Sequence, residues 1–152
     1  MCKCRRVSLW GLVAVAAIAQ GEVKAAPPAP KVYAFCVDVV KKVRHPRVGF
    51  NFNLCHWLKV EGNKDYRPLL RANAGKLFCV TICGAQVGAQ TWTNGLIQPL
   101  DRGDFDNRAL LAALREIGYQ GPVGIMCYGI PGDTHEYLQR SMKTWKIWTA
   151  QP

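Results

Sequence analysis

The stretch VGFNFN (residues 48–53) decides the fold, because it is an apolar run of strand length that the chain repeats twice. The later runs are LFCVTIC (residues 77–83) and PVGIMC (residues 122–127). We expect a helix after each run, over residues 65–74, 106–117 and from 133 to about 148. Apolar strands that alternate with amphipathic helices are typical of an α/β fold with a parallel sheet. About three strands are predicted, which is too few to close a barrel.

Capping residues support the helix predictions. Asp106 is placed as the N-cap of the second helix. Gly118 can adopt the left-handed backbone conformation that commonly ends a helix. Asp133 or Thr134 can cap the last helix. Residues 34–43 resemble the end of a helix that Pro46 stops, and no strand is visible before it. The loop 84–103 is long for a connection without structure, which is typical of functional lids.

The first 33 residues are expected to lie outside the folded domain. A basic start and an apolar stretch over residues 7–19 predict a signal peptide over residues 1–25, with a cleavage site before Ala26. A Pro- and Ala-rich linker follows over residues 26–33, and the domain covers residues 34–150. This layout predicts a secreted or periplasmic protein. The alternative is an uncleaved N-terminal membrane anchor.

The charge balance does not indicate a nucleic-acid partner. The formal net charge is +10, and it falls to +7 without the four basic residues and one acidic residue of the predicted signal. The remaining basic residues are scattered over several helices without an alternating aromatic platform, so we interpret them as solvated helix faces. They include Lys41, Lys42, Arg44, Arg47, Arg67, Arg71, Lys143 and Lys146.

The cysteines favour neither a disulfide framework nor a zinc site. Two of the seven fall in the predicted signal, and five is an odd number. Cys79 and Cys83 lie four residues apart on one strand, too far apart to pair. We expect most cysteines to be small buried side chains. Cys55 beside His56, or Cys83 near Cys127, could ligate zinc, but the chain has no CxxC pair to support this.

Two segments carry a resemblance to a known family. Residues 48–57, VGFNFNLCHW, resemble the strand and loop that bear an Asp-x-x-His pair in xylose isomerase-like TIM barrels. Residues 97–106, IQPLDRGDFD, together with LREIGYQGPV at 114–123, resemble the ending of sugar phosphate isomerases and epimerases. The resemblance extends over about residues 34–148 and implies a partial TIM barrel, similar to the C-terminal part of an eight-stranded one. It implies isomerase or epimerase chemistry in carbohydrate metabolism.

The resemblance also implies a divalent metal (Mn, Zn, Co or Mg), but most ligand positions differ. His56 matches the family histidine, whereas Asn53 stands in place of its aspartate. Thr81 and Gly84 replace a His-x-x-Asp pair, and Met126 replaces a glutamate. Neutral side chains cannot restore the lost anionic charge. We therefore expect this chain alone to hold no cofactor, or a metal only weakly at His56.

Three functional hypotheses remain open, and the sequence leaves uncertain whether the chain is an enzyme. As an isomerase or epimerase of a small sugar or sugar phosphate, it would use His56 to shuttle a proton and Lys59 to stabilise developing negative charge. As a non-catalytic carbohydrate-binding or interaction remnant, it would use aromatic rings and amides. It could also be a truncated copy without activity, and a sheet face without covering helices predicts self-association. The predicted substrate-binding residues are Asn53, Trp57, Gln86, Gln90, Trp92 and Tyr128.

Overall fold

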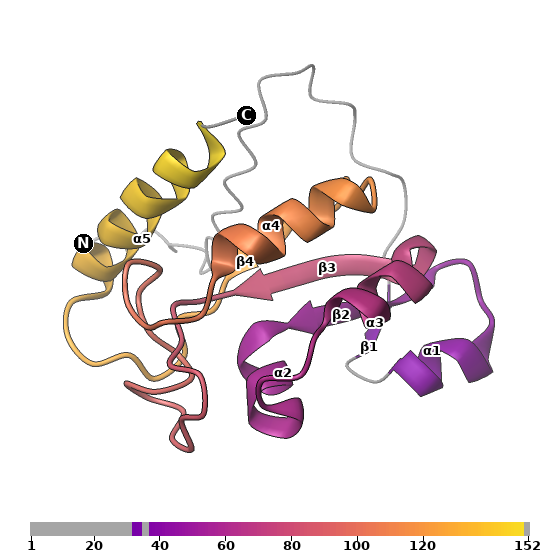
Figure 1. Cartoon of the computed structure of the whole chain (residues 1–152), viewed down its shortest axis with the longest axis horizontal. Helices are drawn as coiled ribbons and strands as arrows, with labels where there is room; N and C mark the ends of the chain where they lie inside the picture. The colour runs from indigo at the N-terminus through magenta and orange to yellow at the C-terminus, as the bar shows by residue number, and fades with distance from the viewer. Residues whose placement is uncertain (1–31, 35–36, 151–152) are drawn as a thin grey trace, which may run out of the picture.

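The computed structural model describes residues 32–34 and 37–150, which form one parallel sheet with helices (Figure 1). The predicted signal peptide and most of the predicted linker lie outside these residues. The strands are β1 (Val32–Ala34), β2 (Val48–Asn53), β3 (Leu77–Ile82) and β4 (Val123–Ile125). They lie in the order β1-β2-β3-β4, and each neighbouring pair is parallel. Sequential order and a common direction are those of consecutive barrel strands.

The predicted partial barrel is confirmed, with one strand more than the sequence indicated. The expectation that no strand precedes the first helix was wrong, because β1 pairs Val32 with Val48 and Ala34 with Phe50. A strand of three residues is too short to show a hydrophobic period. Within the described residues, the repeat therefore begins with a strand that precedes the first helix.

Five α-helices and one 3₁₀ turn occur in the part of the chain that the structure describes. The helices are α1 (Val37–Val43), α2 (Leu54–Glu61), α3 (Arg67–Ala72), α4 (Asn107–Glu116) and α5 (Thr134–Thr149), and the 3₁₀ turn is Ala74–Lys76. The predicted caps are present, since Asp106 accepts from the Ala109 N–H at 2.9 Å and Asp133 accepts from His135. Gly118 has a φ of +67°, as its predicted left-handed ending requires.

The loop predicted to hold His56 and Trp57 is a helix instead. The side-chain oxygen of Asn53 accepts a hydrogen bond from the His56 N–H at 3.3 Å, so α2 begins directly after β2. The sequence prediction placed the first helix after β2 only at residues 65–74, where the structure has the shorter α3. Asn53 therefore acts as a helix cap in addition to ending a strand.

The two faces of the sheet differ in cover. Side chains on one face are buried beneath the helices; these are Phe50, Phe52, Val80 and Ile82. The opposite face, which we call the open face, carries the side chains of Asn51, Cys79 and Thr81, which are only half-buried, and the backbone of Gly124 beside them. Asn51 and Thr81 hydrogen-bond each other there at 3.1 and 3.2 Å. One sheet face thus builds the core, and the other is left incompletely covered.

The long loop after β3 is a packed structure. Gly84 and Gln98 exchange two backbone hydrogen bonds of 3.0 and 2.8 Å, and Leu96 and Leu100 are buried. A Cβ atom on Gly84 would overlap the carbonyl oxygen of Pro99, so the chain approaches itself too closely for any side chain there. These contacts fix the position of Trp92 relative to the strand ends.

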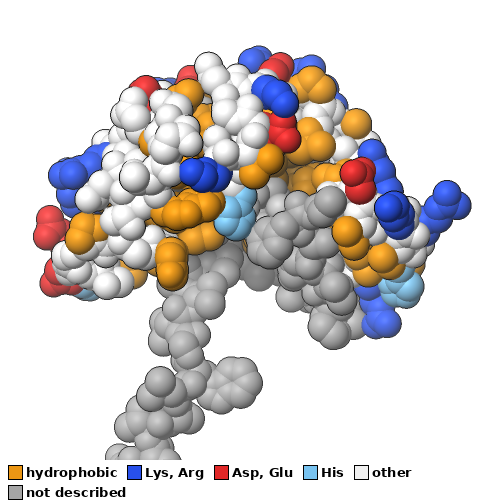
Figure 2. All heavy atoms as spheres, turned by 90° about the horizontal axis from the view of Figure 1, so that it is seen from below, with side chains coloured by type: hydrophobic (Ala, Val, Ile, Leu, Met, Phe, Trp, Pro, Cys, Tyr) orange, Lys and Arg blue, Asp and Glu red, His pale blue; other side chains and the backbone are white. Residues whose placement is uncertain are grey.

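The surface agrees with the interpretation of scattered basic residues. Lys and Arg side chains are dispersed over the face seen in Figure 2, and all eight of the basic residues named above are exposed. No helix within residues 37–150 is long and apolar enough to cross a membrane.

Candidate functional site

The carboxyl ends of β2, β3 and β4 bring together side chains from α2, the long loop and the segment after β4. His56 lies edge-on to the Trp92 ring, with ring centroids 5.4 Å apart. The Lys59 ammonium lies 5.8 Å from the centroid of Trp92 and donates a 2.7 Å hydrogen bond to the Gln90 carbonyl oxygen. Both residues of α2 therefore face one aromatic ring of the long loop.

A small cavity of about 170 Å³ lies beside this cluster, and we call it the strand-end cavity. Its lining contains three residues predicted from the sequence, namely His56, Trp92 and Tyr128. Cys55, Ile97 and Met126 complete it. Trp92 and Tyr128 are exposed, so two aromatic rings are available to a ligand.

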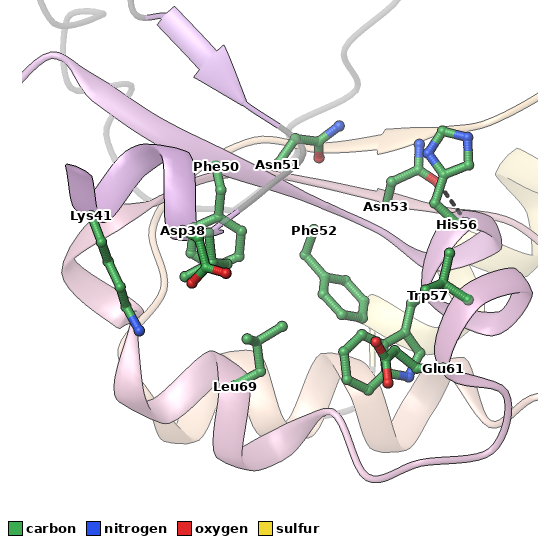
Figure 3. Close-up of a pocket in the computed structure, with 12 residues that line it drawn as sticks. Asp38, Lys41, Phe50, Asn51, Phe52, Asn53, His56, Trp57, Glu61 and Leu69 are labelled. Atoms are coloured by element: carbon green, nitrogen blue, oxygen red, sulfur yellow. Dashed lines mark hydrogen bonds between the residues drawn. The ribbon is translucent and has the colours of Figure 1, made fainter. Parts of the chain in front are cut away.

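A second cavity, of about 570 Å³, lies on the other side of His56 (Figure 3). We call it the β2-edge cavity, because β1 ends level with Phe50 and, on that side of β2, no strand within the described residues continues beside Asn51 to Asn53. Phe50, Phe52 and Leu69 give it an apolar lining, and Asn53 and Trp57 contribute to its wall. Its size is within the range of small-molecule sites. His56 borders both cavities.

The sequence analysis missed three charged residues of the β2-edge cavity: Asp38 and Lys41 of α1, and Glu61 of α2. In Figure 3, Asp38 and Lys41 lie at one end of the cavity and Glu61 lies beside Trp57 at the other. Glu61 also pairs with Lys64 at 2.6 Å. The two carboxylates are therefore separated, and no local signal in the sequence indicated that α1 and α2 border the same space.

Several predicted binding residues are engaged in structural contacts. Asn53 is buried and its oxygen accepts from the His56 N–H and the Cys55 thiol, the latter at 3.0 Å. The Trp57 indole donates to the Lys64 carbonyl oxygen at 3.3 Å. Gln86 donates to the Asp104 carboxylate, and the Gln90 amide donates to the Gly88 carbonyl oxygen at 3.2 Å. These contacts hold the walls of the site in place.

Two buried thiols lie at the strand ends. The Cys55 thiol donates to the Asn53 side-chain oxygen, and the Cys83 thiol donates to the Leu96 carbonyl oxygen at 3.2 Å. The neighbouring Cys55, together with burial, raises the pKa of Cys83 far above its usual range, whereas the neighbouring Cys83 lowers the pKa of Cys55. Cys83 therefore stays protonated at neutral pH and is a poor metal ligand.

The donors at these strand ends do not fit a divalent metal. Within the described ranges, no three His, Cys, Asp or Glu side chains are placed together to hold an ion. Asn51 and Thr81 offer neutral oxygens that are already hydrogen-bonded to each other. Divalent ions are held by anionic oxygens, thiolates and imidazoles, and the strand-end cavity offers only His56 and the buried Cys55 of these kinds, which are too few to hold an ion.

Comparisons with known proteins identify the fold. The family model described as xylose isomerase-like TIM barrel matches residues 33–148. None of the curated proteins compared with the chain matches it.

Three solved structures are similar in fold. A xylose isomerase domain protein from Planctomyces limnophilus is 23% identical with a TM-score of 0.53, and the match covers 75% of this chain and 41% of that one. The IolI protein, solved with a bound zinc atom, is 23% identical (TM-score 0.55; 75% and 42% covered). An AP endonuclease, family 2, from Brucella melitensis is 23% identical (TM-score 0.52; 73% and 36% covered). The chain thus spans about two fifths of the length of these structures.

Proposed function

The chain belongs to the xylose isomerase-like TIM barrel family, and from this membership we propose that it is a carbohydrate-binding domain for a small sugar. The proposed site lies at the carboxyl ends of β2, β3 and β4. TIM-barrel proteins bind their ligands at this end of the sheet, in the loops that follow the strands. The strand-end cavity lies in that place, and the β2-edge cavity borders it at His56.

The observation that carries the proposal is the cluster of His56, Lys59 and Trp92. An exposed indole offers a flat apolar surface for the C–H face of a sugar ring. The imidazole and the ammonium beside it can hydrogen-bond to hydroxyl groups. The Lys59 ammonium could also meet the phosphate of a sugar phosphate, because it lies at the surface and carries a full positive charge.

The donor set favours binding over metal-dependent turnover. Moving a proton next to a carbonyl requires stabilisation of the enediolate charge, which a bound metal supplies in many enzymes. In this chain Thr81, Gly84 and Met126 stand where the resembled family has charged or imidazole ligands, and the strand-end donors do not fit a metal.

Isomerisation or epimerisation is the second candidate function, and the position of Lys59 favours it. His56 and Lys59 lie three residues apart on α2, so both face the same side of the helix. In this reading His56 would transfer the proton and Lys59 would stabilise the oxyanion. The zinc of the IolI structure is consistent with metal use in the family.

Titration of the full chain with simple ketoses, aldoses and their phosphates tests the proposal, with tryptophan fluorescence and calorimetry as readouts. Trp92→Ala should weaken sugar binding about tenfold or more, and Trp92→Phe should recover part of it. Lys59→Met should weaken phosphorylated sugars more than neutral ones, whereas Lys143→Met, which removes an exposed charge on α5, should change the affinity for neither. Absence of binding to the unmodified chain would refute the proposal.

An isomerisation assay with added Mn²⁺, Zn²⁺ or Co²⁺ separates the two candidates. Sugar binding without turnover supports the binding domain. Turnover that is lost in His56→Ala, with sugar binding retained, would instead establish the second candidate.

A further inference from the structure

We propose that two copies of this chain pair edge to edge, with β4 of each beside β1 of the other, to close an eight-stranded parallel barrel. The proposal concerns the sheet and its end helices, so it does not depend on the proposed sugar site. It starts from the arrangement of the strands. Four strands in sequential order, all parallel, are half of the eight that a TIM barrel contains.

The outer edges of the sheet are suited to such pairing. The Val80 N–H donates to the Pro122 carbonyl oxygen at 3.1 Å, and the Met126 N–H donates to the Ile82 carbonyl oxygen at 2.8 Å. Backbone groups alternate in direction along a strand, so the N–H groups of Val123 and Ile125 point away from β3. Within the described residues, β4 pairs with β3 alone and β1 pairs with β2 alone. A strand edge of this kind is a template for another chain.

Exposed apolar side chains lie on the two end helices. Figure 1 places α1 and α5 at opposite ends of the molecule, with α3 and α4 between them. Val39 and Val43 are 48% and 51% exposed on α1, and Leu138 and Ile147 are 38% and 54% exposed on α5. Helices follow one another around a closed barrel, so pairing of β4 with β1 of the second copy would bring α5 against α1 of that copy. Contact between these helices would remove apolar surface from water.

The open face and the symmetry point to the same occupant. In a closed barrel the open face becomes the interior, which would bury the half-exposed Asn51, Cys79 and Thr81. A twofold axis along the barrel generates two identical junctions, so the assembly closes at two copies. A second copy therefore adds four strands that run in the same direction, which brings the total to eight. It also places an end helix beside each outer edge of the sheet.

Like charges oppose this pairing and provide a test. On α1, Lys41 and Lys42 outnumber Asp38, and on α5 basic residues outnumber Glu136. Salt screens such repulsion. We therefore expect the dimer to become tighter, rather than weaker, as salt is raised from low to physiological concentration.

Sedimentation equilibrium of the purified chain measures the association directly. We expect a monomer–dimer equilibrium, and the substitutions Val39→Lys and Ile147→Lys should each weaken it about tenfold or more. Both sites are about half exposed, and circular dichroism checks that the variants fold. Ala72→Lys is the control, because Ala72 is exposed at the end of α3, which lies between α1 and α5 in Figure 1, and its substitution should leave the equilibrium unchanged.

Hydrogen exchange identifies the mode of pairing. The amides of Val123 and Ile125 should gain protection as the protein concentration rises through the dimer range. A monomer at all concentrations would overturn the proposal. A dimer whose β4 amides stay unprotected would overturn it too, because such a dimer would stack sheet faces instead of joining strand edges.

Discussion

Replacement of Tyr137 by phenylalanine should destabilise the fold by about 1 kcal/mol. The Tyr137 side chain is only 5% exposed, and its hydroxyl donates a 2.8 Å hydrogen bond to the Met126 carbonyl oxygen. This bond joins α5 to the end of β4. The substitution keeps the ring and removes one hydrogen bond, so the loss is that of a single net bond rather than of a cavity. Met126 is half-exposed, and water can reach its surroundings, which limits the cost.

Equilibrium unfolding in urea at fixed low protein concentration measures this loss. With a slope of about 2 kcal/mol/M, the midpoint should fall by about 0.5 M and the slope should stay unchanged. Tyr128→Phe is the control, because Tyr128 is 76% exposed and its substitution should shift the midpoint little. Equal shifts in the two variants, or no shift in either, would refute the argument that the Tyr137 hydroxyl ties α5 to β4.

The same residue should give a pH dependence of known sign. Burial raises the pKa of Tyr137 above its usual value of 10.0, and a hydrogen bond with Ser141 offsets only part of this. Above pH 10 the unfolded chain releases the Tyr137 proton while the folded chain retains it, so the free energy of unfolding falls as pH rises. This contribution is fully present below pH 10. The stability difference between the natural chain and Tyr137→Phe should therefore narrow above pH 10, and a widening would contradict the assignment.

Three further predictions follow from single contacts. Asp106→Ala should cost about 1 kcal/mol in thermal or urea unfolding because it removes the α4 cap, whereas Asp106→Asn should retain most of the stability. Gly84→Ala should cost more than about 2 kcal/mol, because its Cβ has no room, whereas Gly75→Ala, with no heavy atom within 4 Å of its added Cβ, should change stability by less than about 0.5 kcal/mol. In the native protein an aromatic disulfide reagent should modify the exposed Cys127 rapidly and the buried Cys83 only on unfolding; rapid reaction of Cys83 would contradict its burial.

The parts of the fold that could be predicted are those with long local patterns. The sequence predicted β2 and β3 to within one residue, because both are mostly apolar runs of six residues. It did not predict β1, because a strand of three residues is too short to show a pattern. It also did not predict the early start of α2, because the sequence does not show that Asn53, at the end of a strand, also caps a helix. Local periodicity carries no information about such short elements.

The site was predictable only in part, for a related reason. The strand-end rule selected His56, Trp92 and Tyr128, and the structure brings these three to one cavity because parallel strands end at the same edge. The rule could not select Asp38, Lys41 or Glu61, whose positions depend on how α1 and α2 pack beside β2. Helix packing is a tertiary property, and it does not produce a residue pattern of fixed spacing that could be recognised in the sequence.

The proposed pairing and the proposed site both involve β4 and the residue after it, but they use different groups. Each proposal can therefore be tested without the other. Met126 lines the strand-end cavity, while the amides that we assign to pairing, which point away from β3, belong to Val123 and Ile125 just before it. All lining residues of the strand-end cavity come from one copy, so the monomeric Ile147→Lys variant should bind sugar with nearly the affinity of the natural chain. All eight strands of the proposed barrel run in one direction, so both copies of His56 would lie on the same rim. If calorimetry instead shows that binding disappears together with the dimer, the site requires groups from the second copy, and the assignment of His56, Lys59 and Trp92 as a sufficient binding cluster fails.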